Sequence, residues 1–182
     1  MMRILIFICF IFFTSCADQV AREPVSQKSG SYINKSVQRN KDLIAQEEKA
    51  ILNLIKKDTS KVYESSPNGF WYTYIQKDTL GNSAPQIGDL VLFNYNIATL
   101  QRETLVSQEE IGNTVTQIDQ SNQELISGIR EGLKLMKEGE TVTFLFPSHK
   151  AYGYYGLDGK IRSNIPIQST VTLLEIKDQT KN

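Results

Sequence analysis

The stretch Glu124–Gly153, ELISGIREGLKLMKEGETVTFLFPSHKAYG, begins with a helical pattern of apolar residues. From Leu125 to Met136 the apolar side chains recur at helical spacing on one face, which predicts a short amphipathic helix. Gly128 and Gly132 lie beside that face one turn apart, where the backbone can approach a neighbouring layer closely. The first half of the stretch is therefore expected to pack against another layer.

In the second half of the same stretch the period changes to two. The pair Glu138-Gly139 is expected to end the helix. Residues Thr141–Phe146 then alternate as in a strand, and Pro147 ends that strand because it has no N–H to donate. The sequence therefore predicts a helix lying on a sheet, with the loop Ala151-Tyr152-Gly153 beyond the strand.

This ordered set of motifs resembles a known family. Leu125-Ile126-x-Gly128-x-x-x-Gly132-Leu133, then Met136-x-x-Gly139-Glu140, a strand and Ala-Tyr-Gly, is similar to the core signature of FKBP-type peptidyl-prolyl isomerases. The likeness runs from about Gly88 to Lys177. It implies an α+β fold, a curved antiparallel sheet wrapped around one short helix, with an isomerase domain over residues 88–178.

Other segments have the composition of strands, and they support the same α+β class. Residues 70–87 are expected to hold the first strand and a lead-in with a turn at Leu80-Gly81-Asn82. The first strand is expected at Phe70–Gln76. The other strands are expected at Leu90–Ala98, Thr104–Ser107, Thr114–Ile118 and Thr170–Ile176.

The first sixteen residues have the pattern of an export signal. Arg3 precedes about ten apolar residues, which is shorter than the roughly 20 that span a membrane. Thr14-Ser15-Cys16 looks like a bacterial lipobox, so we expect Cys16 to be the lipidated first residue of a periplasmic protein held on the outer membrane, facing inward. An ordinary secretory signal is the alternative. Cys9 lies inside the apolar segment, so the mature chain would have no disulfide.

Residues 17–69 are expected to hold a tether and an N-terminal helix. Ala17–Ser31 is polar and without period, Ser36–Lys57 has a narrow apolar stripe, and Thr59–Gly69 is rich in turn residues. The stripe favours either a helix docked on its own domain or the seam of a homodimer. Its members are Val37, Ile44, Ile51, Leu54 and Ile55.

The composition argues against several functions. Twenty lysines and arginines balance twenty aspartates and glutamates without a basic cluster, so nucleic-acid binding is not expected. His149 is the sole histidine, and there is no His/Cys cluster and no phosphate-binding loop. We therefore expect no metal and no cofactor.

The family resemblance implies the site residues and a substrate, which is a proline-containing polypeptide. Tyr95, Ile126 and Tyr152 match the family's catalytic groove, with the backbone N–H of Ile126 and the hydroxyl of Tyr152 contacting the peptide. Plain core packing is the alternative for each residue, most of all for Leu125 and Ile129. The matching substrate-binding positions are Leu105, Val106, Leu125, Ile129, Ile165 and Pro166.

The sequence also departs from the family pattern. Leu105-Val106 replaces Phe-Asp, and Ile129 stands where the most active members carry a tryptophan. Such a groove fits a low-activity isomerase or a peptide-binding chaperone without useful catalysis. The lipoprotein signal, the first strand and the AYGYYG loop resemble the gliding-motility-associated FKBP-type lipoproteins, which implies a helper or structural subunit for motility and secretion machinery.

Overall fold

The strand predicted at Thr141–Phe146 is an inner strand of the sheet. The structure is a computed structural model that describes residues 29–79, 83–119 and 125–177. Its strands are β1 (Glu64–Ser66), β2 (Phe70–Gln76), β3 (Leu90–Tyr95), β4 (Ile97–Thr99), β5 (Thr104–Val106), β6 (Thr114–Gln117), β7 (Thr141–Phe146) and β8 (Ile167–Lys177). They pair antiparallel in the order β1-β2-β7-β8-β3-β6, and β4 pairs with β5 and β8. This is the predicted α+β fold.

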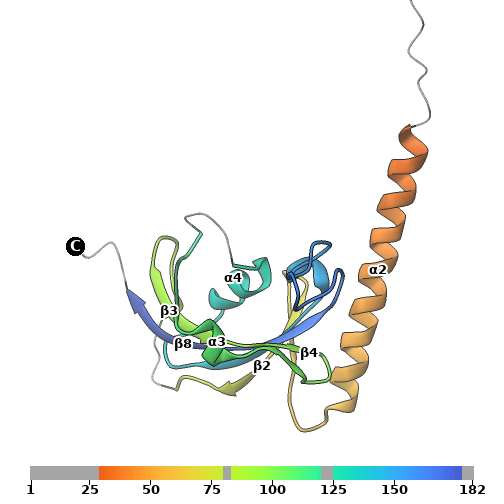
Figure 1. The fold of residues 1–182 in the computed structure, drawn as a ribbon. Helices are drawn as coiled ribbons and strands as arrows, with labels where there is room; N and C mark the ends of the chain where they lie inside the picture. The colour runs from red at the N-terminus through yellow and green to blue at the C-terminus, as the bar shows by residue number, and fades with distance from the viewer. Residues whose placement is uncertain (1–28, 80–82, 120–124, 178–182) are drawn as a thin grey trace, which may run out of the picture. The chain divides into compact units, whose positions relative to one another are not determined.

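The helix predicted from the same stretch is α4 (Ser127–Leu133), which packs on the concave side of the curved sheet (Figure 1). Its two glycines allow that approach. A Cβ atom on Gly128 would lie 2.6 Å from Phe146 Cδ1, and one on Gly132 would lie 2.8 Å from Phe144 Cζ. The close approach predicted from the sequence is thus confirmed. Phe144 and Phe146, stacked with ring centroids 5.5 Å apart, form the surface beneath the helix.

α4 is shorter than the predicted helix. After Leu133 the N–H of Leu135 and of Met136 bond three residues back, to the carbonyls of Gly132 and Leu133, so the chain leaves the α-helical pattern in tight turns. The predicted terminator, Gly139, lies in a separate turn with φ +84°. The apolar period continues past Leu133 because Met136 is still buried in the same core.

Several predicted boundaries move because tertiary hydrogen bonds decide them. The predicted strand Leu90–Ala98 divides at Asn96, whose side-chain oxygen accepts the N–H of Thr170 at 2.9 Å. β8 begins three residues earlier than expected. β1 lies in the stretch expected to be a turn-rich link, and a short helix, α3 (Gln108–Ile111), follows β5.

The N-terminal helix, α2 (Ser29–Lys57), begins seven residues before the predicted Ser36, so the expected tether overlaps its first turn. Residues 29–36 contain no proline to stop the helix. The chain divides after Val37 into two units, and the second holds the sheet and the rest of α2. The turn expected at residues 80–82 and the signal segment with Cys16 lie outside the described residues.

One face of α2 in the second unit packs on its own domain. Ile51 has no exposed surface and clusters with Leu100 and Leu145, and Leu54 and Ile55 pack beside it. This confirms the docked interpretation for the C-terminal part of the predicted stripe. Val37 is 47% exposed. In the described ranges, no helix combines the length and the apolar character needed to cross a membrane.

Candidate functional site

The residues predicted for the groove gather around one buried cluster. Val106 and Ile129 belong to that cluster, and Ile129 has no exposed surface, so it supports the site from beneath instead of facing solvent. All the others except Pro166 are half-buried and pack against the cluster. They are Tyr95, Leu105, Leu125, Ile126, Tyr152 and Ile165.

Two phenol groups face this region from different elements. Tyr95 ends β3 and stacks on Phe93, with ring centroids 5.7 Å apart. Burial raises the pKa of Tyr95. The pKa of Tyr152 is raised to about 12, mainly by burial and secondly by repulsion from the negative charge that an ionised Tyr95 would carry. Among the described residues neither hydroxyl has a hydrogen-bond partner. Both phenols therefore remain protonated near neutral pH and are free to donate to a ligand.

The loop that carries Tyr152 is fixed by its backbone. The turn η1 (Ser148–Lys150) follows Pro147, and the carbonyl of Ser148 accepts the N–H groups of Ala151 at 2.9 Å and Gly153 at 2.8 Å. The Gly153 carbonyl accepts the N–H of Asn164 at 2.8 Å. These bonds join the Tyr152 loop to the segment that leads into Ile165-Pro166.

Ile126 is placed by the start of α4. It is the residue before the helix, with φ −58° and ψ 144°, and its carbonyl accepts the N–H of Arg130 at 3.2 Å. No described residue accepts a hydrogen bond from the Ile126 N–H. The site thus has one backbone donor and two phenols beside an apolar surface.

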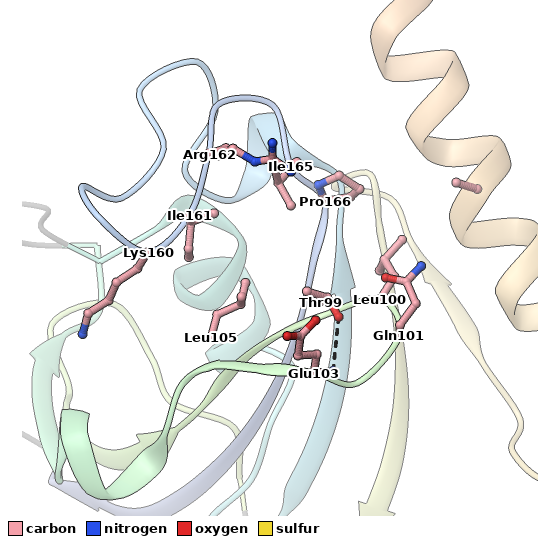
Figure 2. A pocket seen from close by; sticks show the side chains of 11 residues that line it. Thr99, Leu100, Gln101, Glu103, Leu105, Lys160, Ile161, Arg162, Ile165 and Pro166 are labelled. Carbon is pink, nitrogen blue, oxygen red and sulfur yellow. Dashed lines mark hydrogen bonds between the residues drawn. The ribbon is translucent and has the colours of Figure 1, made fainter.

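A cavity of about 470 Å³ adjoins this site (Figure 2). Leu105, Ile165 and Pro166 line it, whereas Tyr95, Ile126 and Tyr152 do not, so the predicted groove edge and the predicted catalytic set lie on neighbouring surfaces. Sequence reasoning missed the rest of the lining. Those residues are Ala50, Thr99, Leu100, Gln101, Glu103, Lys160, Ile161 and Arg162.

The missed residues had a weak sequence signal. Ile161 is an isolated apolar residue in a polar loop, and it is only 5% exposed. Leu100 follows the strand that the structure divides, and Ala50 comes from α2, outside the stretch with family motifs. Lys160, which lines the cavity, forms an ion pair with Glu110 of α3.

The structure also locates the residues that sequence analysis set aside. His149 is exposed, as expected. Over residues 29–79, 83–119 and 125–177 no group of three histidines, cysteines or acidic residues is arranged to hold a metal ion. Tyr95, Tyr152 and the Ile126 N–H are neutral hydrogen-bond donors beside apolar side chains, whereas Glu103, Lys160 and Arg162 bring charges to the adjoining cavity.

Comparison with known proteins gives a family match over half of the chain. Residues 81–174 match the family described as FKBP-type peptidyl-prolyl cis-trans isomerase. Human peptidyl-prolyl cis-trans isomerase FKBP9 is 32% identical over 89 residues, which are 49% of this chain and 15% of that protein. FkpA of Escherichia coli K12 is 30% identical over 124 residues, covering 66% of this chain and 43% of FkpA. The chain therefore spans less than half the length of these relatives.

Solved structures have the same fold. The crystal structure of Escherichia coli FkpA superposes with a TM-score of 0.59 at 23% identity, covering 94% of this chain and 78% of that one. A peptidyl-prolyl cis-trans isomerase from Pseudomonas syringae pv. tomato DC3000 gives 0.57 at 19% identity, covering 74% and 96%. At these identities the likeness establishes the fold alone.

Proposed function

Since the chain belongs to the FKBP-type peptidyl-prolyl cis-trans isomerase family, we propose that it catalyses cis-trans isomerisation of X-Pro bonds in polypeptide clients. The observation that carries this proposal is the convergence of Tyr95, Ile126 and Tyr152 on one apolar cluster. No cofactor takes part in the proposed reaction.

The chemistry of isomerisation suits such a site. Rotation about the X-Pro bond has a barrier of roughly 20 kcal/mol because it breaks amide resonance. The twisted amide is less polarised than the planar one, so an apolar surface that excludes water favours the transition state. The Ile126 N–H and the Tyr152 hydroxyl would then hold the peptide carbonyls in place. Each 1.4 kcal/mol of differential binding increases the rate about tenfold.

A weakly catalytic or non-catalytic chaperone is the second candidate, and particular residues favour it. Val106 provides no carboxylate. Ile129 is fully buried, and it stands at the position where the most active relatives are expected to have a tryptophan. The site therefore has fewer fixed polar contacts to tighten in the transition state. Peptide binding without rapid turnover would follow from the same apolar surface.

We further propose that the protein works on exported proteins from a lipid anchor at Cys16, in the periplasm. The short apolar segment ending in Thr14-Ser15-Cys16 supports this location. The likeness to gliding-motility-associated FKBP-type lipoproteins supports a role in folding or assembling motility and secretion components.

A protease-coupled assay on a proline peptide tests the proposal, using the soluble form that begins at Ala17. Isomerisation faster than the uncatalysed rate, and lost in a variant with Ile126→Pro, supports catalysis because proline removes the backbone donor. Circular dichroism of this variant checks that it is folded. Peptide binding with an uncatalysed rate would instead establish the chaperone.

A further inference from the structure

A buried carboxylate joins the N-terminal helix to the loop that carries Tyr152. Glu47 of α2 is 5% exposed, and Ser148 is 2% exposed. The two Glu47 oxygens accept the Ser148 N–H at 2.8 Å and the Ser148 hydroxyl at 2.7 Å. Glu47 lies outside residues 81–174, the part of the chain that matches the family.

The partner of Glu47 is the residue on which the Tyr152 loop is built. While its N–H and hydroxyl are directed to Glu47, the Ser148 carbonyl accepts the N–H groups of Ala151 and Gly153. These two residues flank Tyr152. Ser148 thus links Glu47, through its N–H and hydroxyl, to the two N–H groups that flank Tyr152, through its carbonyl.

Other hydrogen bonds that hold this loop come from residues within the family domain itself. The Ser127 hydroxyl at the start of α4 donates to the Lys150 carbonyl at 3.3 Å, and Asn164 N–H donates to the Gly153 carbonyl. The Glu47 bonds are shorter than the Ser127 bond and are charge-assisted, which makes hydrogen bonds stronger. Removing the carboxylate would leave two buried donors without partners.

Packing fixes the register of this contact. Ile51 lies one helical turn after Glu47 and is fully buried with Leu145, which comes three residues before Ser148 on the chain. The helix thus contacts two successive parts of the β7-to-loop segment, an apolar contact at the strand and a polar one at the turn. The two hydrogen bonds add a directional constraint to this packed contact, because a hydrogen bond weakens steeply when its geometry departs from the ideal.

We propose that Glu47 is a positioning residue, through which α2 holds Tyr152 in the geometry that the isomerase site needs. Glu47 does not touch the peptide. It acts through Ser148, whose carbonyl accepts hydrogen bonds from the N–H groups of Ala151 and Gly153. The N-terminal extension is by this inference part of the working enzyme.

Three variants of the full mature chain separate positioning from general stability. Glu47→Ala removes both bonds, and Glu47→Gln retains an acceptor for the N–H and an amide that can bond the hydroxyl. Ile51→Ala is the matched control, since it weakens α2 packing without touching Ser148. Amide hydrogen exchange of Ala151 and Gly153 is measured by NMR in each, corrected for global stability. We expect exchange about tenfold faster in Glu47→Ala than in Ile51→Ala, and near wild type in Glu47→Gln.

The kinetic arm rests on the proposed isomerase function. Tyr152→Phe should lower kcat/KM less in the Glu47→Ala background than in wild type, because the hydroxyl is already displaced there. In the Ile51→Ala background its effect should be unchanged. Equal exchange in Glu47→Ala and Ile51→Ala, or full additivity with Tyr152→Phe, would overturn the proposal.

Two further outcomes are decisive. If Glu47→Ala does not fold, Ser148→Ala removes the hydroxyl donor alone, and unchanged exchange at Ala151 and Gly153 in that variant counts against positioning. If the wild type has no isomerase activity, the proposed function fails, but the exchange comparison still decides whether Glu47 holds the loop.

Discussion

At the scale of single residues, Tyr152 gives the sharpest test of the site. Tyr152→Phe keeps the ring and removes a hydroxyl that no described residue bonds. A hydrogen bond contributes about 0.5–1.5 kcal/mol, so isomerase kcat/KM should fall roughly two- to tenfold while the denaturation midpoint stays unchanged. Tyr155→Phe, in the same loop and 92% exposed, is the control and should alter neither. A large loss of stability with activity per folded molecule intact would make Tyr152 a core residue.

The same phenol gives a prediction of pH dependence. The pKa of Tyr152 is about 12 in the folded chain and about 10 in the unfolded chain, and burial is the largest cause of the difference. A group whose pKa is higher in the folded chain than in the unfolded chain contributes stability at pH values below the unfolded pKa. That stability is lost as the pH rises through the folded pKa. The free energy of unfolding should therefore fall between about pH 10 and 12, and fall less in Tyr152→Phe, as measured by urea denaturation. An identical pH slope in both proteins would contradict this. Tyr72 is half-buried and its pKa is also raised to about 12, so its share of the pH dependence persists in the variant.

At the scale of elements, α2 divides into a docked part and an exposed part. Ile51 is buried on the domain, whereas Ile33 is 61% and Val37 47% exposed, one turn apart on the helix. We propose that any homodimer forms through the exposed pair, because isolated helical surface of this kind gains stability by packing. Ile33→Lys with Val37→Lys should convert a dimer to a monomer in sedimentation velocity. Leu52→Lys, at 43% exposed, is the control. A monomeric wild type, or a dimer that survives the double change, would reject this seam.

At the scale of the whole molecule, the proposed lipid anchor would place the protein at a membrane. Cys16 follows small residues at the end of a short apolar segment, and multiple acyl chains give stable membrane attachment. Cys16→Ala should move the protein from the membrane fraction or leave it unprocessed. Mass spectrometry of the wild type should find acyl chains on the mature N-terminus. An unmodified N-terminus would point to the ordinary secretory signal.

Local patterns in the sequence were sufficient for the centre of the fold. The change to period two at Thr141–Phe146 and the close approach of Gly128 and Gly132 to a neighbouring layer follow from side-chain spacing. Strand β2 follows from its aromatic and β-branched composition, and the structure confirms all three. The groove set was placed by resemblance, and the structure brings it around one cluster. The boundaries that failed, such as the break at Asn96, depend on hydrogen bonds to a strand more than 70 residues away.

The tertiary structure alone decided what the N-terminal helix does. Its apolar stripe was compatible with docking or with dimerisation, because periodicity tells which face is apolar but not what covers it. In the sequence nothing separates Glu47 from the other charged residues of the helix, and only the fold brings it within hydrogen-bond distance of Ser148, 101 residues along the chain. A buried polar pair has no local signature, since each partner is stabilised only by the other once the chain is folded.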